Sequence, residues 1–525
     1  MRPQKYLAML AVLVAFSTSD LQANTAGDNQ LLSTIEKVPP PPKSINDLVK
    51  VLDSSRPELE TIRKKEAIAD SKPADNLDRT ALYNFYKNRA KAAEELGRVQ
   101  QLKRDCQLQL QYVGSDPNLK NDSYRDCIQA EFLDGNPLAA IALLKKTIAE
   151  LPPNQMYGWH MSFNMLLVNA YRQIGDFKSA EVSMRDIDGL IILLRRGPSW
   201  AELGDHWTYQ AERARGEYLQ AEGKHVAAEL SFIRALVAID SRIKQLESGM
   251  YGQSTRRLHD PNSGYFSKAI VMHRLGNSLL AQRKLVEAEY YLRSSLTTYL
   301  RVSARNSTSV AGVLNALAYC VAEQGRVNEA LILAQYANQV IQEAGIRPAS
   351  TAMIYSRKAL AASYVNAEKY AEALEQFKLM RSAIDQDADA KERIRNLDDL
   401  DEVVARIYMK DPAGAQKIVE SMYQKNLTGV GKNHPRTAWT QAFLGMTLQD
   451  QGLSKEARAH FDQAMSVLID QARNDSENQT ISLKFQKRFS IIIESYISVL
   501  FVEAQANPAQ AKDLIARAFQ LADMA

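Results

Sequence analysis

Five alanines recur at a nearly constant interval through the second half of this 525-residue chain. Ala288, Ala330, Ala373, Ala415 and Ala457 lie 42 or 43 residues apart, and most of them have similar neighbours. A fixed period of this size is typical of stacked-repeat proteins, in which each unit buries its apolar face against the next. The period therefore predicts the architecture of the molecule, although it says little about what the molecule binds.

The most complete unit consists of two predicted helices joined by a turn. In the first helix, Gly445 has no side chain, so the partner helix can approach closely. Gly452 lies at the turn, where a positive φ angle is accessible to glycine. Ala457 is the small contact residue of the second helix. The small and apolar residues that define this unit are Leu444, Gly445, Leu448, Gly452, Ala457, Phe461 and Ala464.

This pattern resembles the tetratricopeptide repeat, and copies of it cover most of the chain. The resemblance implies an all-α fold, a right-handed superhelical α-solenoid of about nine or ten helix pairs. The period near 42 and the segment Gly-Lys-Asn-His-Pro-Arg-Thr-Ala at 431–438 resemble kinesin-light-chain-type repeats. In that segment, Thr437 is expected to cap the new helix. Clear copies surround Ala180, Ala228, Ala288, Ala330 and Ala373, and degenerate copies surround Ala140, Ala415 and Ala511.

Breaks in the pattern divide the rest of the chain after a signal segment at 1–23. Residues 24–77 are expected to form a Pro-rich tether and an irregular segment, because four consecutive prolines at 39–42 favour an extended conformation. Residues 78–266 contain divergent repeats, and residues 267–525 contain regular ones. The interval from Ala228 to Ala288 is 60 residues and includes an inserted loop at 248–265. Its composition indicates an ordered loop, and both a functional role and tolerated decoration stay open.

The first 23 residues are predicted to be a secretory signal peptide. Arg2 and Lys5 precede the apolar run from Leu7 to Phe16, and the small residue Ala23 closes the segment. The apolar run is about half as long as a membrane span. No later stretch is expected to cross a bilayer, so no membrane span is expected after signal cleavage. The protein is therefore expected to be exported, either into a periplasm or out of the cell.

The chain has three cysteines, Cys106, Cys127 and Cys320. Their odd number and unrelated spacings do not fit a disulfide framework. The favoured interpretation is three small buried hydrophobic residues. The alternative is a disulfide between Cys106 and Cys127, because they fall on neighbouring predicted helices and an exported protein meets an oxidising compartment.

No catalytic or cofactor-binding motif is present in the sequence. The seven histidines have no metal-ligand spacing. The net charge of +4 is too small to indicate a nucleic-acid or anionic-membrane partner. The acidic pairs Asp398-Asp399 and Asp401-Glu402 are interpreted as solvated helix faces or caps. The protein is therefore expected not to be an enzyme and to hold no cofactor and no metal.

The resemblance also implies a concave groove lined by the first helix of each pair. In the resembled family, side chains at positions two, five, nine and twelve of that helix tend to face inward. Polar and aromatic side chains there suit an extended peptide, because amides bond its backbone and rings cover its side chains. The expected partner is therefore a protein or peptide segment. The groove candidates are Gln210, Arg213, Glu217, His273, Asn277, Asn315, Tyr319, Tyr355, Lys358 and Trp439.

The favoured function is thus an exported interaction scaffold without chemistry of its own. An alternative comes from residues 511–525, which resemble the last repeat helix of bacterial proteins that continue into a caspase-like CHAT domain. That resemblance implies the sensor or regulatory region of a protease whose catalytic domain is absent from this chain. An envelope-assembly adaptor fits the fold equally well by analogy.

Overall fold

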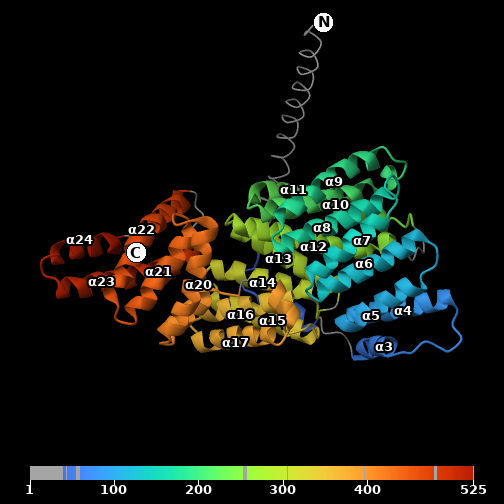
Figure 1. Cartoon of the computed structure of the whole chain (residues 1–525). Coiled ribbons are helices and arrows are strands. Elements are labelled where there is room, and N and C mark those ends of the chain that lie inside the picture. The colour runs from blue at the N-terminus through green and yellow to red at the C-terminus, as the bar shows by residue number, and fades with distance from the viewer. Residues whose placement is uncertain are drawn as a thin grey trace, which may run out of the picture.

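The computed structural model describes residues 39–42, 44–54, 59–251, 257–303, 305–394, 397–477 and 482–523. Over these residues the chain forms α-helices and one short 3-10 helix, η1 (Arg257–His259), with no strand (Figure 1). The prediction of an all-α fold is therefore confirmed. The predicted signal peptide at 1–23 lies outside the described residues.

The helices form pairs that stack in the order of the sequence (Figure 1). The hand of the superhelix and the number of true repeats stay predictions. The first helices of the pairs are α4 (Arg79–Glu95), α6 (Pro117–Leu133), α8 (Tyr157–Ile174), α10 (Trp200–Ala221), α12 (Pro261–Ala281), α14 (Thr308–Glu323), α16 (Thr351–Asn366), α19 (Leu400–Tyr408), α21 (Pro435–Gln449) and α23 (Leu483–Ala506). The second helices are α5 (Val99–Tyr112), α7 (Pro137–Glu150), α9 (Phe177–Arg195), α11 (His225–Glu247), α13 (Leu285–Val302), α15 (Val327–Glu343), α17 (Tyr370–Asp385), α20 (Pro412–Val430), α22 (Ser454–Glu477) and α24 (Ala511–Ala522). Outside these pairs lie α2 (Asn46–Ser54), α3 (Leu59–Ala69) and α18 (Ala388–Arg393).

Side-chain caps fix where many first helices begin. In α21 the cap is His434, whose Nδ1 accepts a hydrogen bond from the Arg436 amide at 3.1 Å. Thr437, the expected cap, instead donates its hydroxyl to the Gly431 carbonyl at 2.7 Å. The reason is that His434 and Pro435 already occupy the cap and first helical positions. Other first helices begin after Asp78, Asp116, Ser307 and Ser350, whose side chains accept from backbone amides.

The five spaced alanines lie at the seams between helices. Ala288, Ala373, Ala415 and Ala457 have no exposed surface, and Ala330 is also buried. A small side chain at each of these positions lets the first and second helices pack at close range. The periodic alanines therefore have the role that the sequence predicts.

Substitution of a seam glycine is expected to destabilise the stack. A Cβ atom on Gly216 of α10 would lie 2.6 Å from the ring of Phe232, which is fully buried in α11. Gly216→Ala should therefore lower the free energy of unfolding by about 1–3 kcal/mol, because the ring must move. Gly189→Ala is the matched control, since a Cβ at that helical position meets nothing within 4 Å. Equal effects of the two substitutions in urea denaturation would contradict the close approach.

The helix pairs form two layers. Successive first helices contact one another, from α8 through α10, α12, α14, α16, α19 and α21 to α23. Over the described residues, the second helices contact chiefly the first helices on either side of them. Elements on the inner side of a curved stack lie closer together than those on the outer side, so we assign the first helices to the inner layer.

The stack curls until distant units meet. The turn after α6 contacts the segment between α15 and α16, and Figure 1 shows α5 next to α15. Arg347 donates from Nε to Asp134 Oδ1 at 2.8 Å and from Nη2 to Oδ2 at 3.0 Å, across 213 residues of sequence. Thr351 donates its hydroxyl to the Gly135 carbonyl at 3.0 Å. The N-terminal pairs are therefore anchored to the middle of the chain.

Residues 44–54, within the segment predicted to be a Pro-rich tether and irregular, pack against the second helices and include the helix α2. Arg293 of α13 donates to both carboxylate oxygens of Asp47, at 2.8 and 2.9 Å. Ile45, Leu48 and Leu52 are buried in the same core cluster as residues of α13 and α15. The spacing of these three apolar residues places them on one helical face, which explains why the segment docks. Residues 24–38 lie outside the described residues.

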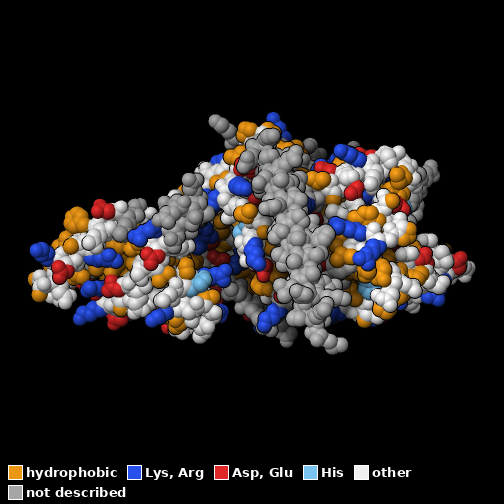
Figure 2. Space-filling view, turned by 90° about the horizontal axis from the view of Figure 1, so that it is seen from above, with side chains coloured by type: hydrophobic (Ala, Val, Ile, Leu, Met, Phe, Trp, Pro, Cys, Tyr) orange, Lys and Arg blue, Asp and Glu red, His pale blue; other side chains and the backbone are white. Residues whose placement is uncertain are grey.

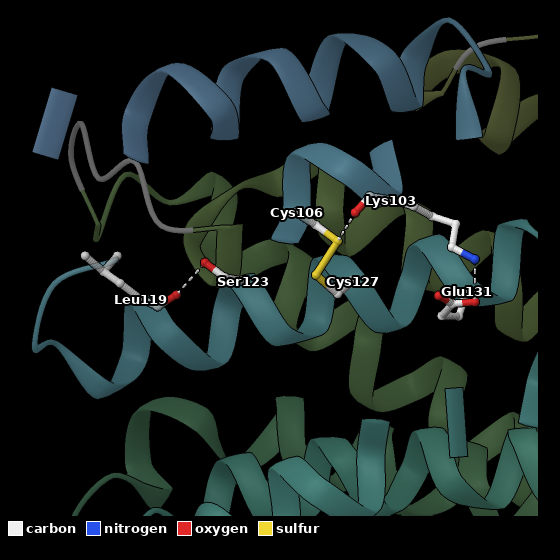
Figure 3. The surroundings of a disulfide bond; sticks show 6 residues. All are labelled: Lys103, Cys106, Leu119, Ser123, Cys127 and Glu131. Atoms are coloured by element: carbon white, nitrogen blue, oxygen red, sulfur yellow. Dashed lines mark hydrogen bonds and ion pairs between the residues drawn. A yellow bond between two sulfur atoms is a disulfide. The ribbon is translucent and has the colours of Figure 1, made fainter. Parts of the chain in front are cut away.

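Cys106 of α5 and Cys127 of α6 form a disulfide, with Cα atoms 5.3 Å apart (Figure 3). The interpretation as free buried thiols is therefore wrong for these two and right for Cys320, which is free and buried. The physical reason is that α5 and α6 pack directly against each other, which brings the two side chains within bonding reach. The ion pair between Lys103 and Glu131, at 2.9 Å, crosses the same helix interface.

α23 is the one helix, among the described residues, that is long and apolar enough to cross a membrane by length and composition. The sequence-based expectation of no such stretch is wrong on that test. The apolar residues of α23 that point inward, among them Ile492, Tyr496 and Leu500, are buried in a core shared with α21, α22 and α24. We therefore interpret α23 as a core helix of the stack.

The segment expected to be an inserted loop is partly helical. α11 extends to Glu247 and α12 begins at Pro261, so the longer interval is filled partly by longer helices. The described ends of the loop surround the buried Arg242, which donates to the Tyr251 hydroxyl at 2.5 Å and the Leu258 carbonyl at 3.1 Å. Residues 252–256 lie outside the described residues.

Candidate functional site

Three arginines surround one carboxylate where α8, α10 and α12 meet on the inner layer. Arg213 donates from Nε to Glu217 Oε1 at 3.1 Å. Arg274 of α12 donates from Nε to the same oxygen at 3.4 Å. Arg172 of α8 interacts electrostatically with all three of these residues. We call Arg172, Arg213, Glu217 and Arg274 the inner arginine cluster.

The inner arginine cluster holds a surplus of positive charge. Burial raises the pKa of Glu217, but Arg213, Arg274 and Arg172 outweigh it and lower that pKa to about 2. Burial and the neighbouring Arg274 lower the pKa of Arg172 to about 10, against the opposing effect of Glu217. One carboxylate therefore faces three guanidinium groups. This is an uneven balance for a buried site, where charges are normally paired.

Two polar atoms of the cluster are buried and have no hydrogen-bond partner among the described residues. They are Nε of Arg172 and Oε2 of Glu217. Buried polar atoms in folded proteins nearly always find a partner, so an orphaned pair beside excess charge indicates a place where water or a ligand group binds. The unpaired Arg172 Nε is a donor, and the group that suits it is an anion.

The predicted candidates on α10 lie inside the stack. Gln210, Arg213 and Glu217 are all buried. Gln210 bridges two first helices, because its Nε2 donates to the Ser162 hydroxyl of α8 at 2.9 Å. Glu217 and Arg213 contact each other directly, as described above. Gln210 and Glu217 therefore connect α10 to its neighbours α8 and α12.

His273 of α12 is half-buried and packs near Gly312 of α14. Burial, together with the positive charges of the nearby Arg274 and Arg172, lowers its pKa to about 3. The imidazole is therefore neutral at neutral pH. It adds no charge to the positive surplus around it.

The exposed candidates are aromatic and amide side chains on the inner layer. Tyr319 of α14 is 47% exposed and Tyr355 of α16 is 64% exposed. Tyr355 also interacts electrostatically with Arg172, which places it beside the inner arginine cluster. Asn277 and Asn315 are half-buried, and Asn315 Oδ1 has no hydrogen-bond partner within the described chain. Tyr355 therefore supplies an exposed ring beside the cluster, whereas Tyr319 interacts with Glu323, Arg283 and Arg488.

The remaining two candidates are engaged by neighbouring residues. Lys358 forms an ion pair with Asp399 at 3.0 Å. The Trp439 indole N–H donates to Gln471 Oε1 at 3.1 Å, and its ring packs edge-on against Phe485 with centroids 5.1 Å apart. Trp439 is partly buried and packs against the core of the C-terminal pairs. The structure therefore separates it from the inner arginine cluster.

A second charged group lies where α19 meets α17 and α23. Glu402 accepts from Arg381 at 2.5 Å and from Arg406 at 3.0 Å. Asp401 accepts from Lys484 at 2.6 Å and from Arg488 at 2.5 Å. Both carboxylates are buried, so the interpretation of this acidic pair as solvated is wrong. The partners of Asp401 lie 83 and 87 residues away in the sequence, which explains why this residue resembles a surface feature there.

In the neighbouring acidic pair, Asp399 has the capping role that the sequence indicates, whereas Asp398 is half-buried and pairs with Lys425 at 2.9 Å. Asp399 accepts from the Asp401 amide at 2.9 Å and caps α19. A hollow of ≈ 420 Å³ opens beside Glu402. In this hollow Glu402 contacts two arginines, whereas Asp385 pairs with Lys391 at 3.6 Å. The residues that line it are Lys378, Arg381, Ser382, Asp385, Gln386, Glu402 and Arg406.

Comparison with known proteins identifies the repeat. A tetratricopeptide repeat family matches residues 437–468, which form the most regular unit. No curated protein matches the chain. Together with the stacked pairs, the family match defines a helical repeat fold of the tetratricopeptide type.

Solved structures with similarity to this chain include two that are described as having tetratricopeptide-type repeats. Kinesin light chain TPR-like repeats from Podosopora anserina are 17% identical with a TM-score of 0.31, and the match covers 40% of this chain and 98% of that one. BtubC (BKLC) from P. vanneervenii is 17% identical with a TM-score of 0.34, and the match covers 46% of this chain and 92% of that one. The signal transduction ATPase PH0952 from Pyrococcus horikoshii, which has a tetratricopeptide repeat sensor, is 13% identical with a TM-score of 0.34, covering 81% and 53%.

Proposed function

We propose that this protein is an exported scaffold that binds an acidic protein segment on its inner layer and has no catalytic activity of its own. Tetratricopeptide-type repeats generally serve as surfaces for other proteins. The observation that carries the proposal is the surplus positive charge of the inner arginine cluster, beside the exposed ring of Tyr355. A carboxylate of the partner would pair with Arg172, and aromatic and amide side chains would hold its backbone.

Export is part of the same proposal. The basic start, short apolar run and small closing residue of the first 23 residues support it. The disulfide between Cys106 and Cys127 also supports it, because structural disulfides persist in oxidising compartments and are rare in the cytosol. A fusion of residues 1–23 to a reporter that is active only outside the cytoplasm tests export directly.

Arg172→Gln is expected to weaken binding of an acidic peptide about tenfold without weakening the fold. The reason is that one charge-assisted contact to a carboxylate is lost, while the surplus of buried positive charge falls. The probe is a fluorescently labelled poly-glutamate peptide, titrated at two salt concentrations, with thermal unfolding measured on the same samples. Binding to the unsubstituted protein should fall as salt rises.

Arg185→Gln is the matched control, because Arg185 is an exposed arginine on the second helix α9. It should leave peptide affinity unchanged. Poly-lysine of the same length should not bind. The proposal fails if both arginine variants bind poly-glutamate as the parent does, or if Arg185→Gln weakens binding as much as Arg172→Gln.

The sensor region of a CHAT-type caspase-like protease stays an alternative prediction that rests on sequence resemblance. The envelope-assembly adaptor likewise rests on fold analogy.

A further inference from the structure

The face of α24 that points away from the stack carries an apolar strip. Ile515 is 42% exposed and Phe519 is 70% exposed, and the small residues Ala516 and Ala522 lie on the same face. The spacing of three and four residues places all of them along one side of the helix. Figure 1 shows α24 at the outer edge of the molecule, and Figure 2 shows apolar side chains at the same end.

The strip borders a hollow between α23 and α24. The hollow has a volume of ≈ 180 Å³, which suits one large apolar side chain. Elsewhere on its surface α23 is covered, because α21 and α22 pack against it. The residues that line the hollow are Ile497, Phe501, Ile515, Ala518, Phe519 and Ala522.

Charges of opposite sign flank the apolar strip. Lys512 lies in the first turn of α24 and Asp523 caps its C-terminal end, and both side chains are exposed. Each charge lies at the end of the helix where the macrodipole disfavours it, so neither position is explained by the stability of α24 alone. Neither side chain forms an ion pair with another described residue. An antiparallel helix of the same sequence would place an aspartate beside each lysine.

We propose that two copies of this chain associate through α24, with the two helices antiparallel about a two-fold axis near Arg517. At about 1.5 Å of rise per residue, this register places Ile515 opposite Phe519 of the second copy. The same register brings Lys512 and Asp523 of the two copies together at both ends. The small side chains of Ala516 and Ala522 allow close helix contact, and Phe519 of one copy meets the hollow of the other.

A second copy explains this face better than a lipid surface does. Helices that lie on membranes carry an excess of lysine and arginine on their polar face, whereas α24 with its C-terminal cap has two basic residues, Lys512 and Arg517, balanced by Asp513 and Asp523. A self-complementary face is what a two-fold interface requires, because each residue contacts its counterpart in the other copy. The dimer would contain two inner layers, one from each copy. If the proposed function holds, a partner with two acidic segments would therefore bind the dimer more tightly than a single copy.

Sedimentation equilibrium of the protein over a range of concentrations tests the proposal. The unsubstituted protein should form a dimer, and Phe519→Glu should weaken dimerisation at least about tenfold, because a buried ring is replaced by a charge. Val226→Glu is the control, since Val226 is 62% exposed on α11 and should leave the dimer unchanged. A monomer at every concentration, or equal effects of the two variants, would overturn the proposal.

Charge reversal tests the antiparallel register. Lys512→Glu and Asp523→Lys should each weaken the dimer about fivefold, and the double variant should restore it, because both ion pairs re-form with exchanged signs. Ala516→Cys should form a disulfide-linked dimer on oxidation, whereas Lys512→Cys should not, because residue 512 lies far from the axis. Crosslinking through residue 512 alone would contradict the register. Binding of phosphatidylglycerol vesicles that is lost in Phe519→Glu, without any dimer, would assign the face to lipid instead.

Discussion

Glu217→Gln is expected to destabilise the protein by about 3–5 kcal/mol, which is among the largest effects that one substitution of this chain can have. Glu217 is fully buried and is the carboxylate that faces Arg213, Arg274 and Arg172. Glutamine keeps the shape of the side chain but leaves the arginine charges uncompensated in the interior. Urea denaturation measures the loss as a shift of the unfolding midpoint.

The pH dependence of stability gives an independent measure of the same carboxylate. Its pKa is about 2 in the folded state, against an ordinary value near 4.5 in the unfolded chain. A carboxylate whose pKa is lowered by folding stabilises the folded state fully above its unfolded pKa, and this stabilisation is lost as pH falls from about 4.5 toward 2. A difference of that size corresponds to roughly 3 kcal/mol. Glu217→Gln should lack this acid-dependent component.

The control for Glu217→Gln is Glu222→Gln, at the residue that caps the C-terminal end of α10. Glu222 accepts from the Tyr218 hydroxyl at 2.9 Å and pairs with Lys224 at 3.0 Å at the surface. Its substitution should change stability by less than about 0.5 kcal/mol. If Glu217→Gln costs no more than Glu222→Gln, then the arginine charges are compensated by a group other than Glu217.

Loss of the disulfide is expected to cost about 3 kcal/mol. Cys106 and Cys127 are 21 residues apart, and a crosslink over a loop of that length restricts the unfolded chain by about this amount. The double variant Cys106→Ser with Cys127→Ser and the reduced parent protein should therefore unfold at similar, lower urea concentrations. Reductant should not affect the double variant.

A count of free thiols completes that test. The parent protein, unfolded without reductant, should release one reactive thiol, from Cys320. Three reactive thiols under the same conditions would show that Cys106 and Cys127 are reduced. That result would also remove one of the two supports for export.

The fold could be predicted because its signal is local and repeated. Gly445, Gly452 and Ala457 each have a role within one helix pair, and the same roles recur at a fixed interval. The residue type at each of these positions depends on contacts with residues within about 40 positions in the sequence, because each repeat contacts only its neighbours. That α5 and α6 are neighbours could be predicted too, but the spacing of two cysteines on them does not distinguish a disulfide from buried thiols.

The candidate site could be predicted only in part, because charge balance depends on residues far apart in the sequence. The positions predicted on α10 lie on the inner layer, whereas Arg172 and Arg274 come from α8 and α12 and look like ordinary helical charges in the sequence. Asp401 likewise looks solvated until Lys484, 83 residues later, is placed beside it. Helix periodicity indicates which face is inward, and only the stacked structure shows which charges meet there.

Hydrogen exchange of the protein with and without the poly-glutamate peptide tests the central claim most directly, because it locates the bound peptide without any substitution. We predict added protection in the first helices α8, α10, α12, α14 and α16, around Arg172 and Tyr355. The second helices α9, α11, α13 and α15 should exchange as before. Protection that appears mainly in those second helices, or protection spread evenly over both layers, would contradict an inner binding surface.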